Sequence, residues 1–207
     1  MIARLHQAAQ RIRRLRPDGW HAAARARLVA GCACLLALGP GGASAADAVP
    51  DLERAVKAAF VFRFLSYVEW PPPAFASADT PIVIGVHGAP DIATELGRIV
   101  SARTVAQRPV VVRPIGERDS LAGLHVLFVG RAQSSRLPAI GRLAQQHSIL
   151  VVSESEDGLP LGSMINLVVN EGRVKFEVYL DSAERSGLRI SSRLLAVAQS
   201  VRSGGGG

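Results

Sequence analysis

The segment VKAAFVFRFLSYVEWPPP, residues 56–73, is rich in aromatic and β-branched side chains and ends at three prolines. Asp51, a few residues upstream, is a residue type that commonly caps a helix start. Pro71 biases Trp70 away from helical geometry, so the helix should end before the prolines. One side of this helix would carry apolar residues at four-residue steps, namely Leu52, Val56, Phe60, Phe64 and Val68.

This segment is too short to be a membrane anchor. Its apolar part, residues 58–68, includes Arg63 and Ser66 and is about half the length of a spanning helix, which needs roughly 20 apolar residues. We therefore expect a buried amphipathic helix that packs against the core.

The residues before this helix read as a secretory leader. Seven arginines precede residue 28, an apolar run covers 28–38, and the small residues Ala43, Ser44 and Ala45 follow a Gly/Pro break. We predict a signal peptide over residues 1–45, a single domain over 46–202 and a flexible Gly-rich tail over 203–207, with the mature protein in the periplasm.

The leader carries almost all of the net charge of +7. Without its seven arginines and Asp18, the chain has 17 basic and 16 acidic residues. Such a balanced domain lacks the positive surface with which proteins bind nucleic acid. Both cysteines, Cys32 and Cys34, also lie in the leader, so the mature chain can form neither a disulfide nor a thiolate metal site.

The next part of the chain alternates between apolar strand-like runs and helical stretches. The strand-like runs are 82–86, 108–115, 124–130 and 148–154, and helices are expected over about 91–101 and from Ser134 or Ser135 to Gln146. This order predicts an α/β fold with a largely parallel sheet that has helices on both faces.

The C-terminal part follows a different pattern. Two strand-like runs flank Asn170-Glu171-Gly172, which predicts an antiparallel β-hairpin with a three-residue loop. A helix capped by Asp181 should follow, and residues 191–201 are expected to form the last helix.

The mature chain shows no catalytic motif. Its histidines, His87, His125 and His147, have no metal-binding spacing, and none of its serines lies in a G-x-S-x-G elbow. His87 stands out because it ends a strand beside Gly88, where α/β proteins often bind ligands. The acidic residues of 153–158 lack the pattern of a calcium loop. We expect no enzymatic activity, no cofactor and no bound metal.

A cationic set near the C-terminus is the candidate ligand site. Arg173, Lys175, Arg185 and Arg189 could hold a small anionic metabolite through guanidinium contacts, or could form a solvated surface balanced by nearby acids. In the first case the protein would be a periplasmic ligand-binding module serving a membrane sensor such as a histidine kinase.

Several motifs together resemble the YfiR family of exported regulators. They are VKAAFVFRFLSYVEWP near the mature start, PIVIGVHG, HVLFVG, and GSMINLVVNEGRVKFEVYLDSAERSGLRISSRLLAVA, and they extend in order from about residue 54 to 199. The resemblance implies a non-enzymatic, often dimeric periplasmic domain. It also implies a role as repressor of an inner-membrane diguanylate cyclase, exerted by binding that enzyme's periplasmic sensing domain and thereby controlling cyclic di-GMP and biofilm formation.

The chain departs from the family in having no periplasmic cysteine, which excludes redox control through thiols. On the resemblance and the apolar first helix we predict a homodimer, in which Val61, Phe62, Tyr67 and Trp70 contact a partner or a second copy.

Overall fold

Four parallel strands form the centre of the molecule. The computed structural model describes residues 45–204, so residues 1–44 of the predicted leader and residues 205–207 lie outside the described part. The central strands lie in the order β4-β2-β5-β6. Their bounds are Arg108–Ile115 for β4, Ile82–His87 for β2, Val126–Val129 for β5 and Leu150–Ser153 for β6. Three of them, β2, β5 and β6, consist mainly of β-branched and other apolar residues that are buried on both faces, whereas β4 is buried only in part.

An antiparallel hairpin extends this sheet. Strand β7 (Ile165–Asn170) pairs parallel with β6, and β8 (Arg173–Tyr179) pairs antiparallel with β7. The outer strands are β10 (Ser200–Arg202), which is parallel to β8, and β3 (Thr104–Val105), which is antiparallel to β4. The predicted α/β class, with a largely parallel sheet and a C-terminal hairpin, is confirmed.

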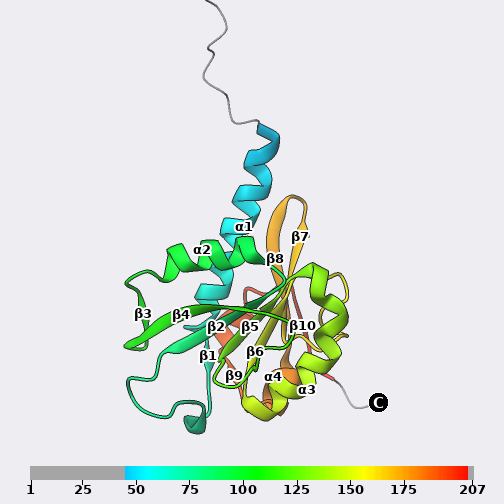
Figure 1. Ribbon diagram of the computed structural model, residues 1–207. Helices are drawn as coiled ribbons and strands as arrows, with labels where there is room; N and C mark the ends of the chain where they lie inside the picture. Colours follow the sequence, from blue (N-terminus) through cyan, green and yellow to red (C-terminus); the bar gives the residue numbers. More distant parts are fainter. Residues whose placement is uncertain (1–44, 205–207) are drawn as a thin grey trace, which may run out of the picture. The chain divides into compact units, whose positions relative to one another are not determined.

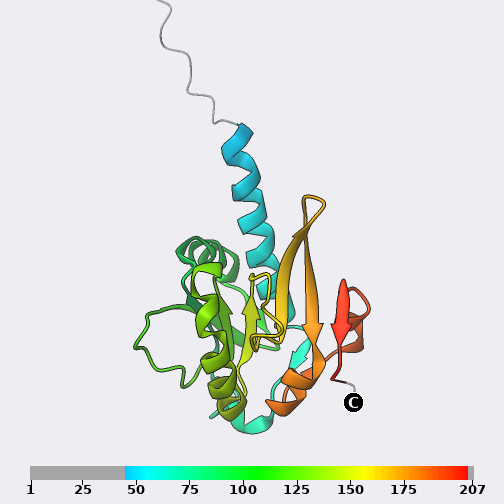
Figure 2. The same cartoon turned by 90° about the vertical axis from the view of Figure 1, so that its right-hand side faces the viewer.

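Helices cover both faces of the sheet (Figures 1 and 2). Helices α1 (Ala45–Phe64) and α2 (Pro90–Val100) pack on the face that carries Phe128 and Phe176, whereas α3 (Leu137–His147) covers the other face. Short elements complete the fold: β1 (Val68–Glu69) pairs with β9 (Arg189–Ile190), and η1 (Pro72–Ala74), η2 (Arg131–Arg136), α4 (Leu180–Arg185) and α5 (Ser192–Leu195) lie in connections.

The predicted start of the first helix is wrong. The helix already includes Ala45 and contains Pro50, so Asp51 lies inside it and does not cap it. Leu52, placed in the buried stripe by its spacing, is 66% exposed because this part of α1 stands beyond the sheet.

Three local predictions near the C-terminus also need correction. The hairpin loop has two residues, Glu171 and Gly172, both with positive φ, which suits the twist of a tight hairpin. Asp181 does not cap α4, and its carboxylate instead accepts the Gly204 N–H at 2.8 Å. The expected last helix ends at Leu195. The chain then turns and pairs with β8, and the first hydrogen bond of this pairing is donated by the Gln199 N–H to the Phe176 carbonyl.

Backbone packing closes the point where α/β sheets often bind ligands. Strands β2 and β5 are neighbours whose following helices lie on opposite faces, which is the arrangement that usually leaves a crevice at their carboxyl ends. Here the Gly130 N–H donates to the His87 carbonyl at 2.8 Å. A Cβ on Gly130 would overlap the Gly88 carbonyl oxygen, so the two loops lie in direct contact.

Candidate functional site

The C-terminal half of α1 is fixed to the hairpin by aromatic packing. Phe64 is completely buried, and its ring meets that of Phe176 edge-on at 5.2 Å between centroids. Phe60 contacts the same Phe176 ring at 5.6 Å. Because aromatic pairs and their buried area both stabilise packing, this contact holds the helix against β8.

A buried lysine provides a second attachment. Lys57 lies in the middle of α1, and its Nζ is 2.6 Å from Glu53 Oε1 on the same helix and 2.6 Å from Glu154 Oε2 after β6. Burial alone lowers the pKa of Lys57, but the hydrogen bonds and charges of Glu154 and Glu53 outweigh it, so that pKa lies above its ordinary value. The lysine is therefore charged, and it ties the helix to the carboxyl end of the sheet.

Apolar side chains continue along both α1 and the hairpin beyond this buried contact. Val56 and Leu52 precede Phe60 at four-residue steps. At about 100° per residue, Val56 is turned by about 80° from Phe64 around the helix axis and Leu52 by about 120°. On the hairpin, Val174 and its cross-strand partner Val169 lie on the same face as Phe176. We call these four residues, Leu52, Val56, Val169 and Val174, the α1–hairpin surface.

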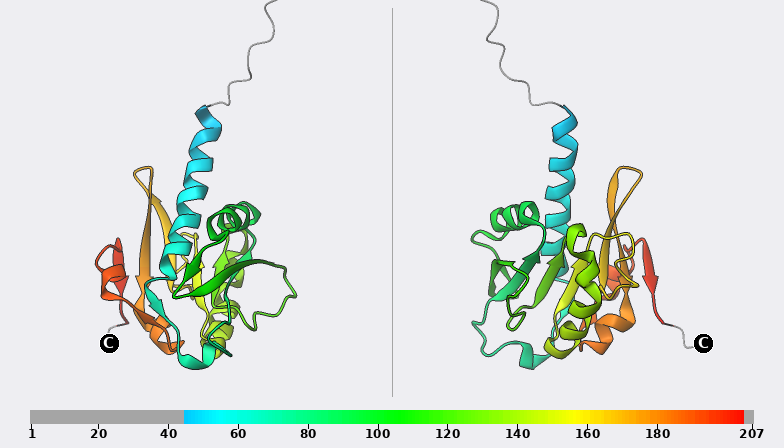
Figure 3. Two further views of the ribbon diagram at one scale, coloured as in Figure 1. Left: turned by 90° about the vertical axis from the view of Figure 1, so that its left-hand side faces the viewer. Right: turned by 45° about the vertical axis from the view of Figure 1, so that its right-hand side comes forward.

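Exposure along this contact rises toward the free ends of both elements. Phe64 and Phe176 are buried, Val56 and Val174 are partly buried, and Leu52 and Val169 are 66% and 46% exposed. The N-terminal half of α1 and the hairpin tip project side by side from the rest of the domain (Figure 3). The α1–hairpin surface is therefore an apolar surface that the rest of the domain covers only in part.

The structure places the predicted partner-contact residues away from this surface. Val61 is 0% exposed and belongs to the core, so its side chain is not accessible to a partner. Phe62 is partly buried, with the Arg103 guanidinium carbon 5.7 Å from its ring centroid. Tyr67 is partly buried, and its backbone carbonyl accepts the Ser191 N–H.

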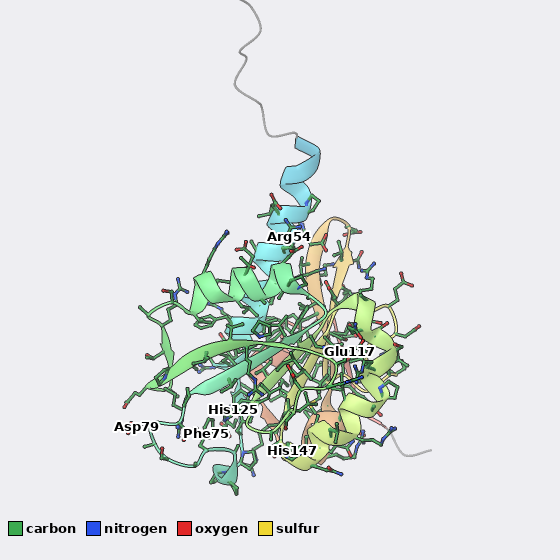
Figure 4. All side chains as sticks on the ribbon, in the orientation of Figure 1. Arg54, Phe75, Asp79, Glu117, His125 and His147 are labelled. Atoms are coloured by element: carbon green, nitrogen blue, oxygen red, sulfur yellow. The ribbon has the colours of Figure 1, made fainter. Side chains whose placement is uncertain are left out.

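Trp70, the fourth of these residues, belongs to an aromatic cluster at the amino end of the sheet. Its indole N–H donates to the His125 carbonyl at 3.1 Å, and its ring packs edge-on against Phe75. Phe75 stacks on the His125 ring at 4.5 Å, and the Arg108 guanidinium covers its other side at 4.0 Å (Phe75 and His125 are labelled in Figure 4). Trp70 thus has a packing role in which most of its contacts are internal.

His125 is held neutral by this cluster. The Val83 N–H donates to Nδ1 at 3.1 Å, and Nε2 lies 3.1 Å from the Ala74 carbonyl, so the proton belongs on Nε2. Burial lowers the pKa of His125 and the Arg108 charge lowers it further, while the hydrogen bond to Ala74 opposes them only in part.

We therefore expect stability to fall in acid through His125. Because the folded pKa lies below the unfolded value of about 6.5, the unfolded state binds more protons below that pH. The contribution is complete above about pH 6.5 and is lost as the pH falls toward the folded pKa. His125→Asn keeps a hydrogen-bond acceptor but does not titrate. Between pH 7.5 and pH 5.0, the free energy of unfolding measured in urea should therefore fall less for His125→Asn than for wild type. The exposed His147→Asn is the control, and an equal loss in all three proteins would contradict the assignment.

The four cations predicted to bind an anionic ligand do not form one site. Arg173 and Lys175 lie near the hairpin tip on the face opposite Phe176, whereas Arg185 lies at the end of α4, over the Tyr179 ring at the other end of β8. At about 3.3 Å per residue, the length of β8 separates Arg173 from Tyr179 by roughly 20 Å. Arg189 pairs in register with Glu69 in the small sheet.

The acidic loop after β6 has a structural use that the sequence did not reveal. Glu154 accepts from Lys57, 97 positions earlier in the chain, and from the Arg131 N–H at 3.4 Å. Nothing local to either residue signals this pairing. Within residues 45–204, no cluster of three or more His, Cys, Asp or Glu side chains could hold a metal ion.

A family model described as YfiR/HmsC-like matches residues 54–199. The chain belongs to this family. The match covers the range over which the sequence motifs suggested the YfiR resemblance, from the start of the buried part of α1 to the turn before β10.

At the level of the family, the YfiR/HmsC-like match supports a periplasmic regulator of cyclic di-GMP signalling. Among the described residues, no helix has the length and apolar character needed to cross a membrane.

Two solved structures show weaker likeness to this YfiR/HmsC-like chain. A conserved domain protein from Vibrio cholerae O1 biovar El Tor is 13% identical with a TM-score of 0.49, over 72% of this chain and 60% of that one. An ABC domain in complex with L-Trp from Streptococcus pneumoniae is 12% identical with a TM-score of 0.44, over 58% of this chain and 55% of that one. The chain thus spans less than two thirds of the length of either structure.

Proposed function

We propose that this protein represses an inner-membrane diguanylate cyclase by binding the cyclase's periplasmic sensor domain through the α1–hairpin surface. The support is the combination of a regulatory family with an apolar contact whose outer end is open to solvent. Exposed apolar side chains next to a rigid, well-packed contact are typical of interfaces, since little conformational entropy is lost on binding.

Charged residues surround the apolar centre of this surface. On α1, Asp51 forms an ion pair with Arg54, which is 3.6 Å from Asp91 of α2. On the hairpin, Glu171 and Arg173 are exposed. An apolar centre with a rim of mixed charge fits a protein partner better than a membrane or a nucleic acid, either of which would select one sign of charge.

The test measures both binding and signalling. We expect Leu52→Glu combined with Val169→Glu to abolish binding to the sensor domain and to raise cellular cyclic di-GMP as far as deletion of the gene does, because both changes put charge into the interface. Stability should stay within about 0.5 kcal/mol of wild type, since both side chains are exposed. The rise should require the cyclase gene.

Val111→Glu provides the matched control. Val111 is also 46% exposed, but it lies in β4 on the far side of the sheet order from the hairpin. It should bind and repress like wild type. Repression that survives the double substitution, or a rise in cyclic di-GMP without the cyclase, would refute the proposal.

We propose that the predicted homodimer uses this same surface, because Val61 is buried in the core and Phe62, Tyr67 and Trp70 are partly covered. Gel filtration at micromolar concentration measures this directly. A dimer that the double substitution leaves intact would place the dimer contact elsewhere.

A further inference from the structure

A pocket of about 120 Å³ lies beneath α3 at the carboxyl ends of β2 and β4. Its apolar lining comes from the strands, the loop after β4 and the helix, and comprises Ile115, Leu121, Leu127, Ala139, Ile140 and Leu143. It lies beside the closed contact of Gly88 with Gly130. The space that α/β sheets often offer to ligands is thus displaced here toward α3.

His87 supplies a buried polar group to this pocket. It is 5% exposed, and its Nδ1 is 2.9 Å from the Ile115 carbonyl, which can only accept a hydrogen bond. In the neutral ring, Nδ1 therefore carries the proton and Nε2 is an acceptor. Nε2 has no hydrogen-bond partner among the described residues. It is not a fully enclosed atom, since the only such unpartnered side-chain atom in the described part is Asn166 Nδ2, so Nε2 is open to a ligand in the pocket that donates a hydrogen bond.

Two carboxylates and one guanidinium lie at the rim. Glu117 is exposed beside α3 (Figure 4), and Asp119 accepts the Gly116 N–H with one oxygen, Oδ2, at 2.8 Å. The Arg136 guanidinium donates a hydrogen bond to the Glu117 backbone carbonyl at 3.1 Å. The rim therefore has a net negative charge, and it adds further acceptors to that of His87.

The size and chemistry of the pocket together define a class of ligand. The volume exceeds that of one water, about 30 Å³, and is slightly below that of an engineered cavity of about 150 Å³ that binds benzene. We infer that this pocket binds a small organic cation, a protonated amine with an apolar body of about the size of a benzene ring. The ammonium group donates to His87 Nε2 and to the rim carboxylates, and the apolar part contacts Leu127 and Ile140.

The pocket lies under α3, on the sheet face opposite α1. Ligand binding is measured on the purified protein alone, so its outcome does not depend on the proposed partner contact. Isothermal titration with benzylamine should give saturable binding with a dissociation constant of about 1 mM or tighter. Benzyl alcohol, of the same shape without the charge, should bind at least about fivefold more weakly, as expected from loss of a charged contact. Benzoate should not bind.

Substitutions locate the site. Leu143→Trp should abolish benzylamine binding by filling the pocket, and it should fold because Leu143 is 43% exposed. Glu117→Gln and Asp119→Asn should each weaken binding about twofold to fivefold. Glu156→Gln removes an exposed acid that does not line the pocket and should have no effect. Equal affinity for all three compounds, an unchanged affinity in Leu143→Trp, or no binding of benzylamine would overturn the inference.

Discussion

Replacing Lys57 with methionine is expected to destabilise the protein by about 3–5 kcal/mol, because it removes one partner of a buried ion pair and leaves the other charge uncompensated. Glu154 and Glu53, which each lie 2.6 Å from the lysine nitrogen, would then face each other without a cation. Methionine fills a similar volume, so lost packing contributes little. Urea unfolding at pH 7 and constant ionic strength measures the change.

Two further variants separate the ion pair from general effects of the substitution. Arg98→Met removes an exposed ion pair with Glu95 on α2 and should cost less than about 0.5 kcal/mol. Adding Glu154→Gln to Lys57→Met should recover part of the loss, since one buried charge is then removed together with its partner. A loss below about 1 kcal/mol in Lys57→Met would show that the attachment of α1 depends on its apolar contacts alone.

Replacing Gly130 with alanine should destabilise the protein by about 3 kcal/mol, at the upper end of the range for overpacked sites. Gly130 has a φ of −67°, which alanine adopts freely, so the cost is steric. The new methyl group would overlap the Gly88 carbonyl, and backbone cannot rotate out of the way as a side chain can. The hydrogen bond from the Gly130 N–H to His87 would be strained at the same time.

Gly97→Ala is the matched control for this change. Gly97 lies inside α2, and nothing comes within 4 Å of an added Cβ. The same substitution should there stabilise the protein by about 0.5–1 kcal/mol, because alanine loses less backbone entropy in a helix. Opposite signs at the two positions would confirm that the β2 and β5 loops are in contact. A neutral Gly130→Ala would indicate that they can separate.

The sequence predicts best what depends on local repetition. The apolar run 82–86 predicts its strand to within a residue, because nearly every position in a covered parallel strand must be apolar. The run 108–115 also matches its strand, although β4 is covered only in part. The side of α1 that faces the hairpin also follows from the four-residue spacing of Val56, Phe60 and Phe64.

Features that depend on distant parts of the chain are not predictable in this way. Spacing shows that Leu52 lies about one turn before Val56, but not that the sheet ends before it reaches Leu52. The burial of Lys57 requires a carboxylate from the other half of the chain. Residues 196–202 suit a helix locally, yet the unpaired edge of β8 offers them a strand partner, and tertiary pairing overrides local preference.

The position of β10 has a consequence for how the chain folds. This strand, Ser200–Arg202, pairs with Glu177–Tyr179 at the outer edge of β8 and follows β8 in the chain. Since a ribosome releases the N-terminal part first, β7 and β8 can pair while their outer edge is still open to other molecules. A nascent chain is therefore vulnerable to intermolecular strand pairing until residues 200–202 emerge, and a truncation before residue 200 would make that vulnerability permanent.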